Sequence, residues 1–191
     1  MTLYFNRGRF GCKQDGEDAV MQADKWNHIT LLVSDFDGVM TDNRVLVDEE
    51  GKESVYVSRA DGQAIHILRS MGIDLMIMST EINGVVGKRA EKLRVKCIQS
   101  VSDKAECLKK YCIENNIPLK SIAYIGNDIN DYEAMRIAGL KIVPQDAYGT
   151  VKDIADYVAE TKGGYGVIRE VADVFYKYKN LRPDEKNNFD I

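Results

Sequence analysis

The chain has 191 residues, of which 45% are hydrophobic and 29% are charged, and its formal net charge is −4 with a pI near 5.3. This length favours one α/β domain and allows a sizeable core without disulfides. The acidic balance argues against nucleic acid as a partner, and the chain contains no long apolar run that would indicate a membrane partner.

The two ends differ from the middle of the chain. Residues 1–26 and 180–191 are polar without a sustained period, so we expect flexible tails on either side of a domain at residues 27–179. The cysteines form no CxxC pair and no signal-peptide pattern precedes them, which indicates reduced thiols and a cytoplasmic location. They are Cys12, Cys97, Cys107 and Cys112.

Between the tails, strand-like and helix-like segments alternate. Short apolar runs predict strands at residues 30–34, 75–79, 96–99, 121–125 and 140–143. Apolar residues at helical spacing predict helices near residues 63–71, 84–94, 104–115, 132–138 and 167–178. The alternation predicts a Rossmann-like parallel sheet with helices on both faces. Residues 44–48 and 53–58, around Asp48-Glu49-Glu50-Gly51, predict a β-hairpin inserted after the first strand.

The run from Leu31 to Asp42 carries two carboxylates, Asp35 and Asp37, at the end of the first strand. Residues i and i+2 of a strand point to the same side, so the two side chains should project together. A divalent cation with oxygen ligands would relieve their repulsion. With that charge neutralised, Asp35 could attack a phosphate and Asp37 could serve as general acid and base. The alternative is a solvated strand end, and Asp42 is expected only to form a turn.

Three further elements carry polar groups at the same edge of the sheet. Ser79 ends a strand, where its hydroxyl could bind a phosphoryl oxygen or cap a helix. Lys104 opens a helix, where its ammonium could hold a nucleophile and a phosphoryl group or lie on the surface. Gly126-Asn127-Asp128-Ile129-Asn130-Asp131 follows a strand and offers oxygen ligands suited to Mg²⁺, or a turn with a cap. Their order along the chain favours the catalytic interpretation.

These four elements resemble the haloacid dehalogenase superfamily, whose phosphatases carry them in this order. The resemblance covers residues 29–178 and is closest to the compact branch without a cap domain, which includes octulosonate 8-phosphate and nonulosonate 9-phosphate phosphatases. It implies an Mg²⁺-dependent hydrolase with Asp35, Asp37, Ser79 and Lys104 as catalytic residues. The implied metal ligands are Asp35, Asp37, Asn127 and Asp128. It also implies a homotetramer with the hairpin at the interface.

The resemblance extends to the substrate. Octulosonate enzymes usually have Thr-Gly-Arg where this chain has Ser79-Thr80-Glu81, and Glu81 with Lys92 resembles the nonulosonate pattern of sialic acid biosynthesis. Glu81 can accept sugar hydroxyls, while Lys92 or Arg89 can pair with a sugar carboxylate. The implied substrate-binding residues are therefore Thr80, Glu81, Arg89 and Lys92. The alternative is a helix whose charges are simply solvated.

One position departs from the family pattern, because Asn127 stands where an Asp metal ligand is usual. An amide oxygen coordinates Mg²⁺ but brings no charge, so Asp128 or Asp131 could compensate. Three functions remain open. They are a nonulosonate 9-phosphate phosphatase, an octulosonate 8-phosphate phosphatase, and a weakly active oligomerisation or regulatory module associated with an acylneuraminate cytidylyltransferase.

Overall fold

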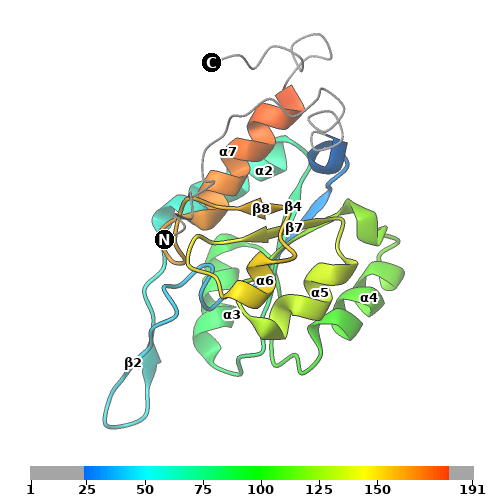
Figure 1. The fold of residues 1–191 in the computed structure, drawn as a ribbon. Coiled ribbons are helices and arrows are strands. Elements are labelled where there is room, and N and C mark those ends of the chain that lie inside the picture. Colours follow the sequence, from blue (N-terminus) through cyan, green and yellow to red (C-terminus); the bar gives the residue numbers. More distant parts are fainter. Residues whose placement is uncertain (1–23, 181–191) are drawn as a thin grey trace, which may run out of the picture.

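A computed structural model describes residues 24–180, which form a parallel β-sheet covered by helices (Figure 1). The sheet has the strand order β5-β4-β1-β6-β7-β8, and every neighbouring pair is parallel. Its strands are β1 (Leu31–Ser34), β4 (Asp74–Met78), β5 (Lys96–Ile98), β6 (Ile122–Ile125), β7 (Leu140–Val143) and β8 (Tyr157–Val158). Because β1 and β6 occupy the centre, their carboxyl ends bring residues that are distant in sequence to one edge.

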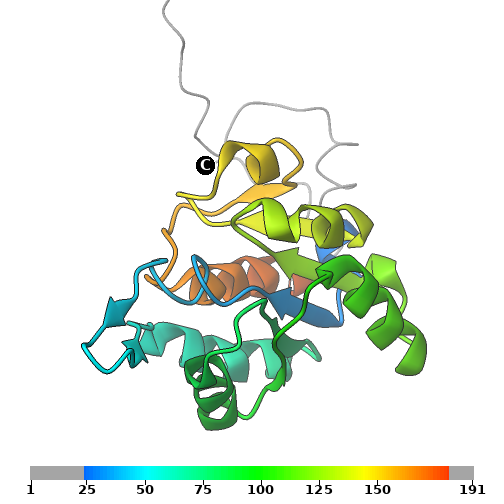
Figure 2. The same cartoon turned by 90° about the horizontal axis from the view of Figure 1, so that it is seen from below.

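Helices cover both faces of this sheet (Figure 2). The α-helices are α2 (Arg59–Ser70), α3 (Gly84–Leu93), α4 (Lys104–Glu114), α5 (Tyr132–Ile137), α6 (Gly149–Lys152) and α7 (Val167–Asn180). Two short 3-10 helices, η1 (Leu119–Ser121) and η2 (Ile129–Asp131), flank β6. The predicted fold class, a Rossmann-like parallel sheet with helices on both faces, is confirmed.

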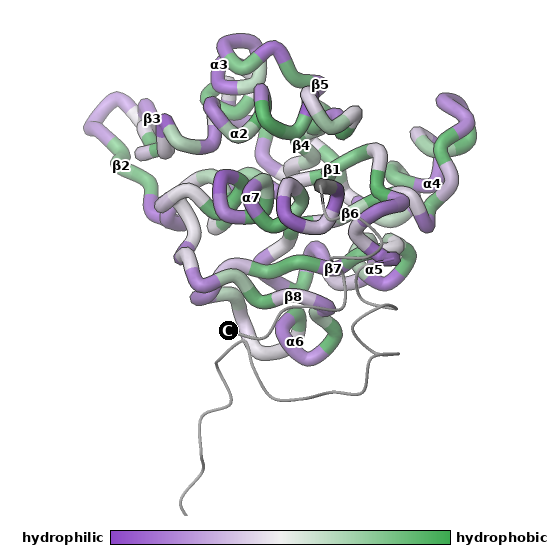
Figure 3. Tube along the Cα trace, turned by 90° about the horizontal axis from the view of Figure 1, so that it is seen from above, coloured by the Kyte–Doolittle hydropathy of each residue, from purple (hydrophilic) through white to green (hydrophobic). Residues whose placement is uncertain are grey.

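Each face of the sheet has its own hydrophobic core. Alternate residues of a strand point to opposite faces, so Leu32 of β1 packs with α2, α3 and α7, whereas Val33 packs with α4, α5 and α6. Figure 3 shows the hydrophobic colouring concentrated along the strands, with hydrophilic positions on the outer surfaces. Burial on both faces explains why the strands are continuous apolar runs.

A β-hairpin projects from the body between β1 and α2 (Figure 1). Its strands, β2 (Leu46–Val47) and β3 (Glu53–Ser54), are antiparallel and shorter than the sequence predicted. Within residues 24–180 no cap domain interrupts the stretch between β1 and α2. The hairpin exposes apolar side chains, including Leu46 at 67% relative accessibility.

The N-terminal boundary of the domain differs from the prediction. Trp26 falls within the predicted N-terminal tail, but its ring is buried and packs against Tyr157, Phe175 and Tyr178. An indole offers a large apolar surface, and its burial places Trp26 against Phe175 and Tyr178 of α7. The remainder of the predicted tails, residues 1–23 and 181–191, lies outside the described residues. No helix in the described part of the chain is long and apolar enough to cross a membrane.

Candidate active site

The site begins where β1 ends. The backbone N–H of Asp35 donates to the carbonyl of Ile125 at 2.9 Å, which extends the pairing of β1 with β6 by one residue. Asp35 Oδ1 accepts the N–H of Phe36 at 2.7 Å, and the residue is only 4% exposed. The carboxylate is therefore held rigidly at the carboxyl edge of the sheet.

Lys104 connects Asp35 to a second buried carboxylate. Its Nζ lies 2.9 Å from Asp35 Oδ1 and 2.7 Å from Asp131 Oδ1, and all three side chains are buried. Lys104 is the first residue of α4, and Asp103 caps that helix by accepting the N–H of Glu106. Burial opposes the ammonium charge, but the two carboxylates outweigh it and raise the pKa of Lys104.

Asp131 orients the site and is not free to bind a metal. Its Oδ1 also accepts the hydroxyl of Tyr124 at 3.0 Å, and its Oδ2 accepts the N–H of Asn127 at 2.9 Å. The suggestion that Asp131 could replace a missing metal ligand therefore has no support in this geometry. The capping box between Asp128 and Asp131 was the sequence signal that could have indicated a structural role.

Asp37 lies in a less enclosed position than Asp35. Burial, followed by the nearby carboxylates of Glu81 and Glu53, raises its pKa, while a hydrogen bond from Thr41 opposes the shift. The Thr41 hydroxyl donates to Asp37 Oδ1 at 3.0 Å. A carboxyl with a raised pKa suits proton donation. Thr41 is a site residue that the sequence pattern does not indicate. Asp42 forms the expected turn by accepting the N–H of Arg44.

Asn127 lies directly beside the backbone that follows Asp37. A Cβ built on Gly38 would be 2.0 Å from Asn127 Nδ2, so only glycine fits there. Asp128 uses one oxygen to accept the N–H of Ile129 at the start of η2. Within residues 24–180 no three His, Cys, Asp or Glu side chains group so as to hold a metal. Asn127 therefore presents an amide, and not a carboxylate, beside the backbone that follows Asp37.

The two carboxyl groups of Asp35 and Asp37 are suited to binding a cation. Burial, and then the charge on Asp131, raise the pKa of Asp35 to about 8 despite the opposing effect of Lys104. Burial is the largest cause of the raised pKa of both Asp35 and Asp37, and a divalent cation beside them would favour their ionised forms. Carboxylate oxygens are among the hard ligands that Mg²⁺ prefers.

Ser79 lies at the same edge, immediately after β4. Its Oγ accepts the N–H of Glu81 at 3.1 Å, which leaves the hydroxyl proton free to donate to a phosphoryl oxygen. Thr80 and Glu81 follow in the exposed loop before α3. The influence of Glu81 on the pKa of Asp37 places its carboxylate at the rim of the site.

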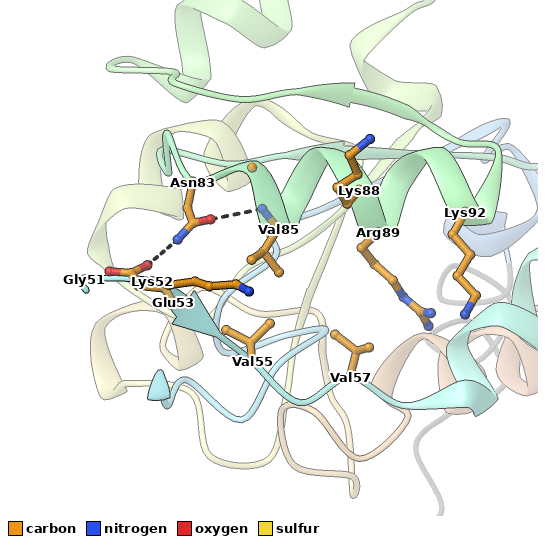
Figure 4. A pocket seen from close by; sticks show the side chains of 11 residues that line it. Gly51, Lys52, Glu53, Val55, Val57, Asn83, Val85, Lys88, Arg89 and Lys92 are labelled. Atoms are coloured by element: carbon orange, nitrogen blue, oxygen red, sulfur yellow. Dashed lines mark hydrogen bonds between the residues drawn. The ribbon is translucent and has the colours of Figure 1, made fainter. Parts of the chain in front are cut away.

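Arg89 and Lys92 form a separate group from Thr80 and Glu81. Both line a groove of about 620 Å³ between α3 and the segment that joins the hairpin to α2, where Val55 and Val57 form the opposite wall (Figure 4). Arg89 Nη2 donates to the carbonyl of Ser58 at 2.8 Å. The structure therefore divides the four predicted substrate-binding residues between the site rim and this groove.

Comparisons with known proteins agree with this geometry. A family model described as haloacid dehalogenase-like hydrolase matches residues 79–171. The 3-deoxy-D-manno-octulosonate 8-phosphate phosphatase KdsC of Yersinia pestis is 32% identical over 148 residues, which cover 77% of this chain and 79% of that protein. The chain belongs to the haloacid dehalogenase-like hydrolases. The predicted enzyme class, a phosphoric monoester hydrolase, is confirmed at the family level.

Two further relatives show which members of the family this chain is similar to. The 3-deoxy-D-manno-octulosonate 8-phosphate phosphatase of Moraxella catarrhalis, solved with magnesium, phosphate and KDO, has a TM-score of 0.80 and 31% identity over 84% of this chain and 92% of that one. Mg²⁺ as cofactor is thereby confirmed for this hydrolase type. N-acylneuraminate cytidylyltransferase A of Danio rerio is 26% identical over 78% of this chain, which spans only 35% of that protein.

Proposed function

We propose that this hydrolase is an Mg²⁺-dependent sugar-phosphate phosphatase that acts on a nonulosonate 9-phosphate through an aspartyl-phosphate. The observation that carries the proposal is the buried Asp35–Lys104 pair, 2.9 Å apart, with Asp37 beside it at the same strand end. A buried carboxylate next to a fixed cation suits attack on phosphorus, because the ammonium can hold nucleophile and phosphoryl group together.

Each residue then has a defined task. Asp35 attacks phosphorus, so that the bond to the sugar oxygen breaks as the acyl-phosphate forms. Asp37 protonates the departing alkoxide and then removes a proton from the water that hydrolyses the intermediate. Ser79 donates a hydrogen bond to a phosphoryl oxygen. Bound Mg²⁺ would supply positive charge between carboxylate and phosphate dianion, held by Asp35, Asp37 and Asn127, with Asp128 as the fourth proposed ligand.

The substrate assignment depends on Glu81. Its carboxylate at the rim can accept hydroxyl groups of a sugar chain that extends from the phosphate, and it takes the place where octulosonate enzymes usually have arginine. Arg89 and Lys92, in the groove beside the hairpin, provide positive charge for a sugar carboxylate. The partial match to an N-acylneuraminate cytidylyltransferase is consistent with a nine-carbon acidic sugar.

A second candidate is hydrolysis of 3-deoxy-D-manno-octulosonate 8-phosphate, because relatives named for that activity are 32% and 31% identical to this chain. A third is a weakly active regulatory module, which Asn127 favours. Phosphate release from both sugar phosphates, with and without Mg²⁺, distinguishes the three. A nonulosonate phosphatase gives the larger kcat/KM on the nine-carbon substrate, and a regulatory module gives little release on either.

The covalent step is tested with Asp35→Asn, because an amide cannot attack phosphorus. We expect turnover to fall by roughly a thousandfold or more, with the folded state retained. Asp42→Asn, in the neighbouring turn, is the matched control and should retain activity. Turnover that survives Asp35→Asn would exclude the aspartyl-phosphate.

We also propose a homotetramer with the hairpin at the interface and a cytoplasmic location. The exposed Val45, Leu46 and Val47 of the hairpin, each more than half accessible, support the assembly because they form an apolar run that a neighbouring subunit could cover.

A further inference from the structure

Asp61 is a buried carboxylate that the proposed chemistry does not use. It lies in the first turn of α2, its residue has 0% relative accessibility, and its Oδ2 has no hydrogen-bond partner. Burial raises its pKa to about 6, whereas N–H groups of Arg169 and Ile168 and the charge of Arg89 oppose the shift. A buried ionisable group that destabilises the fold at neutral pH calls for an explanation.

The contacts of Asp61 show that it caps a distant helix. Its Oδ1 accepts the backbone N–H of Arg169 at 3.3 Å, in the first turn of α7. The residue before α7 is Gly166, which has no side chain to satisfy the free N–H groups there. Asp61 thus supplies, from another helix, the cap that the local sequence lacks.

The loop of residues 163–166 leads into α7 and lies against the turn of residues 38–42. Gly164 N–H donates to the carbonyl of Val39 at 2.9 Å. A Cβ on Gly163 would lie 2.2 Å from the carbonyl oxygen of Gly38, and Gly164 adopts a positive φ of +79°. The two backbones are therefore in direct contact, which side chains at these glycines would prevent.

The turn of residues 38–42 also holds the side chain of Asp37. Thr41 belongs to this turn, and its hydroxyl donates to Asp37 Oδ1 while accepting the N–H of Gly38 at 3.2 Å. A continuous series of contacts runs from Asp61 through the start of α7 and the 163–166 loop to the carboxylate of Asp37. At its other end, the 163–166 loop is anchored by the N–H of Gly163, which donates to Asp146 Oδ1 at 2.9 Å.

We propose that Asp61 is a positioning residue for Asp37. By capping α7 it fixes the 163–166 loop, and that loop holds the turn through which Thr41 orients the general acid. The inference rests on the proposed role of Asp37. It predicts a defect in proton donation to the leaving group, because small displacements of a catalytic group reduce its rate contribution steeply.

The test compares two phosphate esters that differ in their need for an acid. An alkyl phosphate requires protonation of its leaving oxygen, whereas p-nitrophenyl phosphate requires little. Asp61→Ala should lower kcat/KM for the alkyl ester on the order of tenfold more than for the aryl ester. Asp61→Asn keeps an acceptor oxygen at the cap and should restore both values. Asp173→Ala, which removes only the partner of Arg169 on α7, is the control.

Equal losses on both esters, or no loss, in Asp61→Ala would overturn the proposal. If Asp61→Ala fails to fold, Asp146→Ala tests the proposal instead, because Asp146 is exposed and anchors the other end of the 163–166 loop. Asp146→Ala should also lower kcat/KM more for the alkyl ester than for the aryl ester, and equal losses on both esters would overturn the proposal. A wild-type protein that releases no phosphate from either sugar phosphate in Mg²⁺ contradicts the proposed function itself, which separates the two failures.

Discussion

Lys104 Nζ lies 2.9 Å from Asp35 Oδ1, and the two side chains are only 1% and 6% exposed. Such a pair cannot lose one partner without leaving an uncompensated buried charge. The same ammonium also neutralises Asp131, so Lys104 links the nucleophile proposed here to the loop that carries Asn127.

Lys104→Met should therefore lower the free energy of unfolding by about 3–5 kcal/mol, because two buried carboxylates lose their cation. Urea unfolding at neutral pH measures the loss. Lys109→Met is the matched control on the same helix, since Lys109 is half exposed and lies 3.9 Å from Glu106. Its effect should stay within about 0.5 kcal/mol, and equal losses in the two variants would contradict the buried-pair argument.

Asn127→Asp should tighten Mg²⁺ binding, because it adds a negative charge to the proposed ligand set without lengthening the side chain. We expect a roughly tenfold lower Kd by calorimetry and higher activity at limiting Mg²⁺, with a smaller gain at saturation. Asn130→Asp adds the same charge at an exposed position of the same loop and should change little. Unchanged affinity in Asn127→Asp would falsify its assignment as a ligand, and tighter binding without turnover would indicate a regulatory module.

Exchanging charges at the two proposed specificity positions should change sugar preference. Glu81→Arg with Lys92→Glu is expected to lower kcat/KM for a nonulosonate 9-phosphate more than for octulosonate 8-phosphate. Loss of one charged hydrogen bond costs about 1.5–3 kcal/mol, which is roughly tenfold or more in rate. The control exchanges Lys88 and Glu91, an exposed pair 3.0 Å apart on the same helix. Equal losses on both sugars would mean that neither residue contributes to selectivity.

Leu46→Asp should dissociate the proposed tetramer, because it places a charge in the apolar run of the hairpin. Light scattering of the purified protein measures the mass. Ile113→Asp is the control, since Ile113 is 78% exposed but lies on α4, away from the hairpin. A wild-type protein that is an active monomer would contradict the assembly, and an intact tetramer in Leu46→Asp would exclude this part of the hairpin from the interface.

The pH dependence of stability should show the cost of burying Asp61. Its pKa is raised from 3.8 to about 6 in the folded state, so the folded protein holds a proton that the unfolded chain has released between these values. The stabilisation by this proton is complete below pH 3.8 and is lost as pH rises to about 6. The charge of Arg89 on α3 opposes this shift, and Arg169 on α7 contacts Asp61 through its backbone N–H.

Asp61→Asn cannot ionise and should therefore be more stable than wild type at pH 7 by up to about 3 kcal/mol, with the difference disappearing near pH 4. Chemical unfolding across this range provides the measurement. Asp173→Asn on α7 should show no such pH-dependent gain. A constant difference between Asp61→Asn and wild type at every pH would mean that the Asp61 carboxyl titrates normally.

The sequence by itself determined the strands of the central sheet and the residues at their ends. Each of the five predicted strands appears within one residue of its expected bounds. The reason is clearest for β1 and β6, because a strand buried on both faces must be an uninterrupted apolar run. The positions of Asp35, Asp37 and Ser79 followed from where those runs stop, and that of Lys104 from where a helical pattern begins.

Elements whose stability comes from tertiary contacts escaped prediction. β8 has only two residues and forms by pairing with β7, and α6 has only four. α2 begins at Arg59, four residues before its expected start, because Ser58 caps it by accepting the N–H of Ala60. Trp26 joined the core because aromatic residues more than a hundred positions later surround it.

The supports of the site were likewise decided by the tertiary structure. Both carboxylate oxygens of Asp131 accept hydrogen bonds, and one of the donors is Lys104, 27 positions earlier. Asp61 accepts from a backbone N–H that is 108 positions later. Hydrogen bonds across such distances leave no periodic pattern in the sequence, because they depend on which loops the folded sheet brings together. The candidate catalytic residues at strand ends can therefore be predicted from the sequence, whereas the residues that orient them can be identified only from the tertiary structure.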